Sequence, residues 1–137
     1  MDNYPAPPRR AASRLASFRH AFAGLSYMLR TQRNAWIHAC ATVAVTAVGL
    51  WLGLNRWEWA VIILVIGLVW MAEFVNTALE AVVDLASPDL HPLAKVGKDV
   101  AAAAVLVGAV TAVLVGLLVL GPHLWARLSV LFGLPGL

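Results

Sequence analysis

The sequence predicts an all-α membrane protein, in which an N-terminal amphipathic surface helix precedes three transmembrane helices that form an oligomeric bundle. Three observations support this fold class. Hydrophobic residues make up 61% of the 137 residues, charged residues make up only 12%, and the mean hydropathy is +0.81. The apolar fraction exceeds that of ordinary soluble domains. Three apolar stretches have lengths near the roughly 20 residues that cross a bilayer. One of these stretches also carries several carboxylates on a single helical face.

The first segment, residues 1–12, is rich in proline and basic residues and reads MDNYPAPPRRAA. Charged sequence follows it instead of a continuous apolar run, so it does not have the pattern of a secretory signal peptide. We expect a disordered tail on the cytoplasmic side of the membrane.

Residues 13–33 predict an amphipathic helix that lies in the lipid headgroup layer. Apolar side chains recur at alternating steps of three and four residues, and arginines lie on both sides of the resulting stripe. The stripe consists of Leu15, Phe18, Phe22, Leu25 and Leu29. A soluble helix or a calmodulin-target helix has the same pattern. The apolar span that follows favours the membrane surface, where arginine side chains reach toward lipid phosphates.

We place the three spans at residues 35–54, 59–83 and 100–120, followed by a C-terminal tail at residues 121–137. Tryptophans flank the short turn between the first two spans and predict an anchor at one membrane interface. Lysines and arginines concentrate before the first span and in the loop after the second. By the positive-inside rule, the N-terminus and this loop face the cytoplasm of a bacterial inner membrane, and the C-terminus lies outside.

The second span carries four polar residues that we call the acidic face: Glu73, Asn76, Glu80 and Asp84. On a helix, the three carboxylates fall within roughly 40° of one another, and Asn76 lies about 60° to the side. With Asp84 at the inner interface, Glu80 lies about 6 Å deeper and Glu73 about 16 Å deeper. Ionisable groups within a membrane are unfavourable by about 2.5–3.5 kcal/mol each, which favours function over structural hydrogen bonds. We expect this face to meet a neighbouring subunit, because three spans offer little interior.

Other features limit the classes of function. The third span repeats small residues at every fourth position, a pattern that lets another helix approach closely; these are Ala104, Gly108, Ala112 and Gly116. The chain has no GxxxxGK[ST] phosphate loop, its charge placement does not indicate nucleic acid binding, and its single cysteine cannot form an intrachain disulfide. The residues therefore indicate a small polar site near the inner leaflet, where carboxylates hold a divalent cation and lysines meet phosphate.

The string EFVNTALEAVVD, from Glu73 to Asp84, is followed by His91 and by AKVGKD, which ends at Asp99. This arrangement resembles the prokaryotic diacylglycerol kinase family, which includes undecaprenol kinases, over residues 17–120. The resemblance implies an integral membrane lipid kinase, homotrimeric, with active sites between subunits. It also implies transfer of the γ-phosphoryl group of ATP, with Mg²⁺, to the hydroxyl of diacylglycerol or undecaprenol.

The resemblance also implies a role for each matching residue. Glu73 corresponds to the catalytic base with Asn76 beside it, and Glu80 to a magnesium ligand shared with residue 32. Asp84 is predicted as a substrate or interface residue from its depth at the inner membrane interface, and not from the resemblance. The region that contacts nucleotide comprises Asp89, His91, Lys98 and Asp99. Without the resemblance, His91 reads as an ordinary loop histidine, and Asp99 equally well as the acidic residue of a helix N-terminus.

The chain departs from the family pattern at Gln32, where the string TQRN replaces TERN and an amide replaces the usual glutamate. An amide oxygen can coordinate magnesium but removes one negative charge, and Glu80 with the triphosphate can also suffice. Two alternatives therefore stay open. One is a membrane scaffold of the same fold with weak or no catalysis. The other is a small membrane protein that conducts cations along the acidic face, although the other two spans contain no acids.

Overall fold

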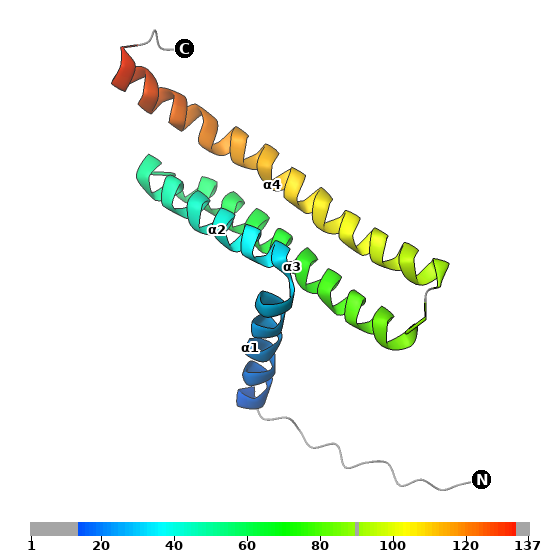
Figure 1. The fold of residues 1–137 in the computed structure, drawn as a ribbon. Coiled ribbons are helices and arrows are strands. Elements are labelled where there is room, and N and C mark those ends of the chain that lie inside the picture. Colours follow the sequence, from blue (N-terminus) through cyan, green and yellow to red (C-terminus); the bar gives the residue numbers. More distant parts are fainter. Residues whose placement is uncertain (1–13, 90, 134–137) are drawn as a thin grey trace, which may run out of the picture.

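The computed structural model describes residues 14–89 and 91–133. Those residues form four helices, α1 (Arg14–Thr31), α2 (Arg33–Leu52), α3 (Arg56–Ala86) and α4 (Pro92–Phe132). Helices α3 and α4 run antiparallel and side by side, and α2 packs beside them (Figure 1). The predicted all-α fold with three membrane-spanning helices is confirmed, because α2, α3 and α4 are each long and apolar enough to cross a membrane. The tail expected at residues 1–12 lies outside the described residues.

The predicted surface helix is separated from the first span by a break at one residue. Gln32 has an extended backbone (φ −105°, ψ 115°), and its N–H donates to the carbonyl of Met28 at 2.8 Å. The indole N–H of Trp36 donates to the carbonyl of Leu29 at 2.9 Å and ties the first turn of α2 to the last turn of α1. Because Met28 is buried at this bend, the direction of α1 relative to α2 is fixed by packing.

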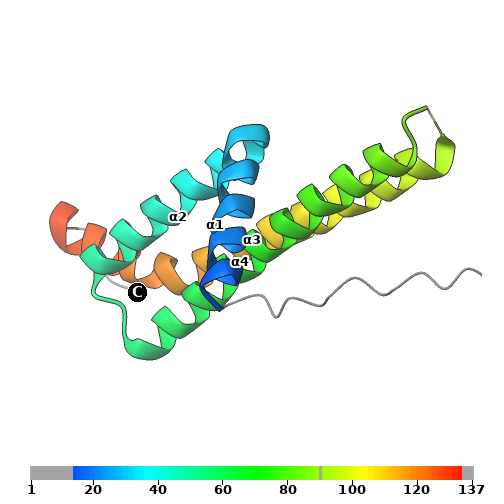
Figure 2. The same ribbon diagram turned by 90° about the horizontal axis from the view of Figure 1, so that it is seen from below.

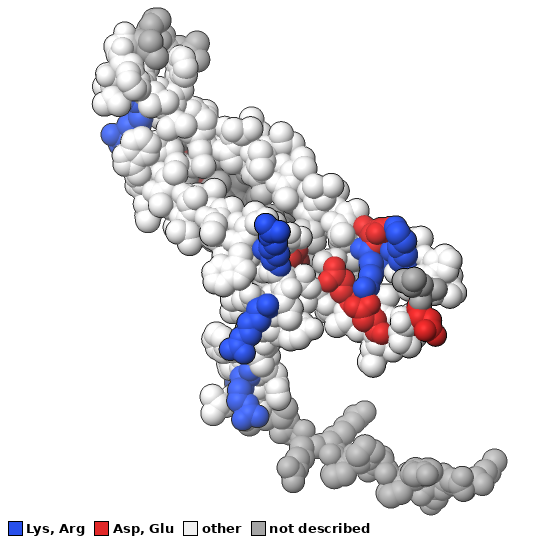
Figure 3. Space-filling view, viewed as in Figure 1, with Lys and Arg blue, Asp and Glu red and all other residues white. Residues whose placement is uncertain are grey.

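Helix α1 turns away from the axis of α2 and does not continue it (Figures 1 and 2). Leu15, Phe18 and Phe22 of its apolar stripe are exposed in the single chain. Arginine side chains gather over α1 and the start of α2, whereas the middle of the bundle carries almost no charge on the face shown in Figure 3. An exposed apolar stripe bordered by arginines suits a helix that lies in the headgroup layer.

The turn between α2 and α3 is tight and has a defined geometry. Gly53 has φ +75°, in the left-handed region that favours glycine at a helix C-terminus. Helix α3 then begins at Arg56, three residues before the expected start of the span, because Asn55 and Glu58 form a capping box. The Asn55 side chain accepts from the N–H of Glu58 at 3.1 Å, and the Glu58 carboxylate accepts from the N–H of Asn55 at 2.8 Å.

The best-packed apolar cluster lies beside this turn. Leu52, Leu54 and Ile62 are buried there, with Trp59 against them. A Cβ added to Gly49 would lie 3.0 Å from the Leu54 side chain and 3.0 Å from the Trp59 ring. A side chain at Gly49 would therefore crowd Leu54 and Trp59, so glycine favours the close packing of this turn, which contributes to the alignment of α2 and α3.

Helix α4 is longer than the predicted third span at both ends. It begins at Pro92 because the His91 ring accepts a hydrogen bond from the N–H of Leu93 at 3.2 Å, and because proline suits the first helical position. It continues through Pro122 to Phe132, so the predicted C-terminal tail is helical over most of its length. Membrane helices tolerate an internal proline when neighbouring groups satisfy the freed backbone carbonyl.

The small residues of α4 serve partly for packing inside the chain. A Cβ on Gly108 would lie 3.9 Å from the Cα of Val69 on α3, whereas a Cβ on Gly116 would meet nothing within 4 Å. The predicted close approach of a second helix is therefore made by α3 at Gly108, and the stripe is open farther along α4.

Candidate functional site

The buried part of the acidic face lies between α2 and α4. Glu73 is 0% exposed, and Asn76 and Thr77 are 5% and 6% exposed. The Thr77 hydroxyl donates to the carbonyl of Glu73 at 2.9 Å, which is a local bond within the helix. We expected this face to meet a neighbouring subunit, and that expectation is wrong for Glu73, which is enclosed by its own chain. Three spans provide enough interior because α2 covers this side of α3.

Glu80 is held by two side-chain amides. The Nε2 of Gln32 donates to Glu80 Oε2 at 2.9 Å, and the Nδ2 of Asn76 donates to Glu80 Oε1 at 3.0 Å. The structure thus brings together the two residues that the sequence proposed as a metal pair. Because the amide nitrogen of Gln32 faces the carboxylate, Gln32 orients Glu80 in this arrangement. The amide would have to turn over to offer its oxygen to a metal.

A second polar pair lies deeper in the bundle and joins α2 to α3. His38 Nε2 is 4.0 Å from Glu73 Oε2, and both side chains are largely enclosed. His38 follows Gln32 by six residues on α2, and Glu73 precedes Glu80 by seven on the antiparallel α3, so the two pairs are about 10 Å apart along the bundle. The sequence reasoning missed His38 because it considered only acids within the spans. A titratable side chain inside an apolar helix was the signal that could have found it.

One further hydrogen bond fixes this alignment. The indole N–H of Trp70 on α3 donates to the hydroxyl oxygen of Thr42 on α2 at 3.1 Å. Thr42 in turn donates to the carbonyl of His38 at 2.8 Å. Since Thr42 is one turn from His38 and Trp70 nearly one turn from Glu73, the His38–Glu73 pair has an inter-helix hydrogen bond on either side of it.

These side chains surround a pocket of about 260 Å³, which we call the site pocket. Its polar lining comprises Gln32, Asn34, His38, Glu73, Asn76 and Glu80. Both carboxylate oxygens of Glu73 and the Oδ1 of Asn76 are buried and have no hydrogen-bond partner among the described residues. Buried oxygens are rarely left unpaired in proteins, so these three atoms indicate a ligand that brings a donor.

Glu80 is the residue of the site pocket that could serve as a ligand of a divalent cation. No three His, Cys, Asp or Glu side chains in the described part of the chain gather as a metal site. Glu80 has one amide donor on each oxygen, which leaves lone pairs free on both. Magnesium is usually bound by one or two carboxylates together with waters and substrate phosphates. Glu80 therefore fits that ion as one protein ligand.

Two exposed ion pairs lie at the end of the bundle where α3 connects to α4. Lys98 Nζ lies 2.5 Å from Asp84, and Lys95 Nζ lies 2.6 Å from Asp99. Acidic and basic side chains cluster over this end of the bundle (Figure 3). Asp99 lies about two turns inside α4, so its interpretation as a helix N-terminal residue is wrong. Lys98 is thus paired with Asp84, which lies one helical turn after Glu80 on α3, and it does not line the site pocket.

The remaining two residues of the predicted nucleotide region have local roles in the connection. The carbonyl of Asp89 accepts from the hydroxyl of Ser87 at 2.9 Å, and His91 caps α4. Neither residue lines the site pocket. Their assignment to nucleotide stays a prediction.

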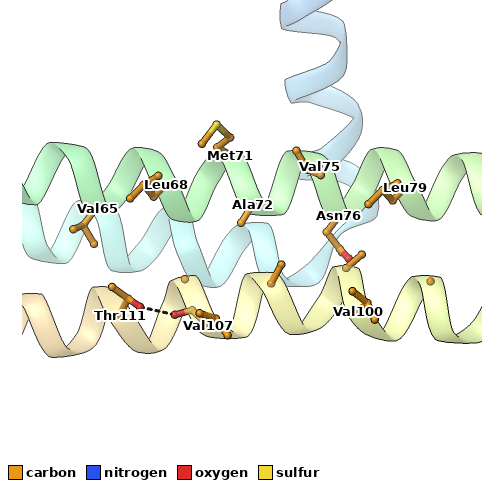
Figure 4. A pocket seen from close by; sticks show the side chains of 14 residues that line it. Val65, Leu68, Met71, Ala72, Val75, Asn76, Leu79, Val100, Val107 and Thr111 are labelled. Carbon is orange, nitrogen blue, oxygen red and sulfur yellow. Dashed lines mark hydrogen bonds between the residues drawn. The ribbon is translucent and has the colours of Figure 1, made fainter.

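A second hollow lies between α3 and α4, which we call the α3–α4 groove (Figure 4). It has a volume of about 600 Å³ and an almost entirely apolar lining. Thr111, one of its few polar residues, donates its hydroxyl to the carbonyl of Val107 at 2.8 Å. Asn76 lines both hollows. Four small residues of α4 contribute to the groove, namely Gly97, Ala101, Ala104 and Gly108.

Comparison with known proteins assigns the chain to a family. The family described as prokaryotic diacylglycerol kinase matches residues 19–120, which is most of the chain. The chain belongs to the prokaryotic diacylglycerol kinase family. The resemblance carried by the string from Glu73 to Asp84 is therefore confirmed, and with it the expectation of a lipid kinase in a membrane. The two alternative functions, a non-catalytic membrane scaffold and a cation-conducting protein, are not favoured.

Members of the family from three bacteria show how far the likeness extends. The undecaprenol kinase of Bacillus subtilis is 45% identical over 108 residues, covering 79% of this chain and 88% of that enzyme. The diacylglycerol kinase of a Synechocystis strain is 48% identical over 115 residues, covering 83% of this chain but only 66% of that enzyme. The diacylglycerol kinase of Helicobacter pylori is 30% identical over 115 residues, covering 79% of this chain and 86% of that enzyme.

Proposed function

We propose that this protein transfers the γ-phosphoryl group of ATP to the hydroxyl of a long-chain lipid, either undecaprenol or diacylglycerol. The observation that carries the proposal is the set of buried oxygens on Glu73 and Asn76 that have no partner among the described residues and that line the site pocket within the membrane span. A lipid hydroxyl is a hydrogen-bond donor that can reach this depth from the bilayer. The lipid hydroxyl can therefore donate the hydrogen bond that these buried oxygens lack.

Glu73 is the proposed base. As the lipid oxygen bonds to the γ-phosphorus, the bond from that phosphorus to the bridging oxygen of ADP breaks, and the hydroxyl proton passes to the Glu73 carboxylate. Asn76 lies between the two carboxylates on α3 and donates to Glu80. It therefore fixes the metal-binding carboxylate relative to the base, which matters because phosphoryl transfer depends chiefly on positioning and charge neutralisation.

Glu80 is the proposed magnesium ligand, and Gln32 keeps its carboxylate in place. When bound, the ion would neutralise charge on the phosphate oxygens. Lys98, whose ion-pair partner Asp84 lies one turn after Glu80, is the proposed cation for the triphosphate, and Asp89, His91 and Asp99 complete the proposed nucleotide region. The two helical turns between Glu80 and Glu73 allow nucleotide to enter from water and lipid from the bilayer.

The proposed location is the bacterial inner membrane, with the N-terminus and the site on the cytoplasmic side and the C-terminus outside. The support is the distribution of charge. Arginines lie along α1 and at the start of α2, and Lys95 and Lys98 lie in the first turns of α4. At the opposite end of the bundle the described helices carry only Arg56 and Arg127 as basic residues.

The proposal is tested by offering both lipids and radiolabelled ATP to the same purified protein in mixed micelles. Glu73→Gln removes the basic oxygen while keeping the shape of the side chain, and we expect turnover to fall by at least about a hundredfold with little change in nucleotide binding. Glu58→Gln is the matched control, because Glu58 lies on the same helix and glutamine also serves in a capping box. Comparable turnover in the Glu73 variant would remove Glu73 from the role of base.

We also propose that the protein is a homo-oligomer, a trimer by resemblance, in which a helix of a second copy occupies the α3–α4 groove. The small residues that line the groove, including Ala104 and Gly108, allow a helix to approach closely where lipid tails remove the hydrophobic drive. Light scattering of the protein in detergent gives its mass directly. A monomeric mass at concentrations that support turnover would reject this assembly.

A further inference from the structure

His38 is a largely but not fully buried polar side chain to which the proposed function assigns no role. Its Nε2 lies 4.0 Å from Glu73 Oε2, and its side chain is 13% exposed. Neither oxygen of the Glu73 carboxylate has a hydrogen-bond partner in the part of the chain that the structure describes. A carboxylate enclosed in this way is strongly unfavourable unless a donor approaches it. His38 is placed to become that donor.

We propose that His38 is a positioning residue for phosphoryl transfer, which donates its Nε2–H to Glu73 Oε2 and leaves Oε1 as the oxygen that receives the substrate proton. The inference rests on the proposed role of Glu73 as base. The separation of 4.0 Å is about 1 Å longer than an N–H···O hydrogen bond. Hydrogen bonds of this kind are often long in a free enzyme and tighten in the substrate complex.

The position of His38 is set by its neighbours on both sides. Toward one end of the bundle, Trp70 donates to Thr42, which itself donates to the His38 carbonyl. Toward the other end, Gln32 donates to Glu80. Both bonds join α2 to α3, so the imidazole is held against the carboxylate while neither bond uses the ring itself.

A fixed donor would have a definite consequence for the base. A carboxylate without partners can rotate and presents either oxygen to the substrate. Once Oε2 of Glu73 is engaged by His38, a single oxygen faces the hydroxyl in one orientation. A displacement of about 1 Å in a reacting group can lower a rate a hundredfold, so this restraint acts on turnover more than on binding.

Three substitutions separate a donor at this position from simple packing. His38→Gln places an amide nitrogen near the position of Nε2, His38→Asn places one near the position of Nδ1, and His38→Leu has no donor. We expect His38→Leu and His38→Asn to lower kcat about tenfold to a hundredfold, with KM for MgATP unchanged within about twofold. We expect His38→Gln to retain kcat within about threefold. Equal losses in all three variants, or full activity in His38→Leu, would overturn the inference.

His123 offers a matched control. Its Nε2 lies 3.4 Å from Glu58, so it forms a similar histidine–glutamate pair at the opposite end of the bundle. We expect His123→Leu to leave kcat unchanged. If His123→Leu lowered kcat as much as His38→Leu does, the effect would be one of general helix packing and the inference would fail.

A second measurement does not depend on turnover. In protein labelled with ¹⁵N at its histidines, Glu73→Gln removes the charged partner of His38 and should shift the His38 ring resonance while leaving that of His123 in place. An unmoved His38 resonance would show that the pair does not form. The proposed function fails separately, because it predicts that the unaltered protein phosphorylates a lipid whatever residue 38 does.

Discussion

Gln32→Glu tests whether residue 32 lies beside the nucleotide-bound metal. In the structure the Gln32 amide donates to Glu80 Oε2 at 2.9 Å. The substitution removes this donor and sets a second carboxylate about 4 Å from the first, where two unit charges interact by about 4 kcal/mol at an effective dielectric constant of 20. Without a metal this repulsion destabilises the protein. With a divalent cation between the carboxylates, the added charge becomes an attraction.

Because Gln32 is only half-buried, water screens much of that energy. We take about a third of this energy, roughly 1.4 kcal/mol. For Gln32→Glu this corresponds to a tenfold decrease in the concentration of Mg²⁺ needed for half-maximal rate. The assay varies free Mg²⁺ at saturating ATP and measures initial rates. Thermal melting with and without Mg²⁺ should show a larger metal-dependent stabilisation in Gln32→Glu than in the unaltered protein.

Gln32→Leu is the control for the lost hydrogen bond, because it removes the donor to Glu80 and adds no charge. The half-maximal Mg²⁺ concentration should not fall in this variant. An identical Mg²⁺ titration for Gln32→Glu and the unaltered protein would refute the reasoning and place residue 32 away from the metal.

Two further outcomes concern the nucleotide and the far end of the bundle. We expect Lys98→Met to raise KM for ATP about tenfold if Lys98 contacts phosphate, while its exposed ion pair with Asp84 contributes less than about 1 kcal/mol to stability; Lys95→Met, which also breaks an exposed pair, should leave KM unchanged. We expect Gly49→Val to lower the free energy of unfolding by about 1–3 kcal/mol and the melting temperature with it, because even its first carbon would lie 3.0 Å from Leu54 and Trp59. Gly67→Val is the comparison, since nothing lies within 4 Å there.

The number and order of the helices follow from the sequence because apolar length and amphipathic periodicity are local properties. The helix ends depend on capping. Asn55 and Glu58 have the spacing of a capping box, and that signal could have moved the start of α3 from residue 59 to Arg56. The extension of α4 beyond residue 120 is harder to predict from the sequence. Pro122 indicates a helix end in a water-soluble protein, whereas a helix in an apolar environment continues through it.

The site could be predicted only in part. The face shared by Glu73, Asn76 and Glu80 follows from helical periodicity within one segment. The partners on α2 do not, because they depend on how two antiparallel helices align, and that alignment is set by packing at Gly49 and by the Trp70 hydrogen bond. His38 lies outside the acidic string, so its role becomes visible only once α2 and α3 are placed together.

The turn at Gly53 therefore fixes which residues of α2 and α3 lie opposite each other at the distant site. Counting back along α2 from this turn gives His38 and then Gln32, and counting forward along α3 gives Glu73 and then Glu80. One alanine inserted into α2 after His38 would rotate His38 and Gln32 by about 100° and displace them by about 1.5 Å, so both pairs would separate together. A matching alanine in α3 before Glu73 would restore the axial register but would turn the carboxylates away from α2 as well. The outer half of this hairpin can therefore change in length only if both arms change together, each by about a whole number of helical turns.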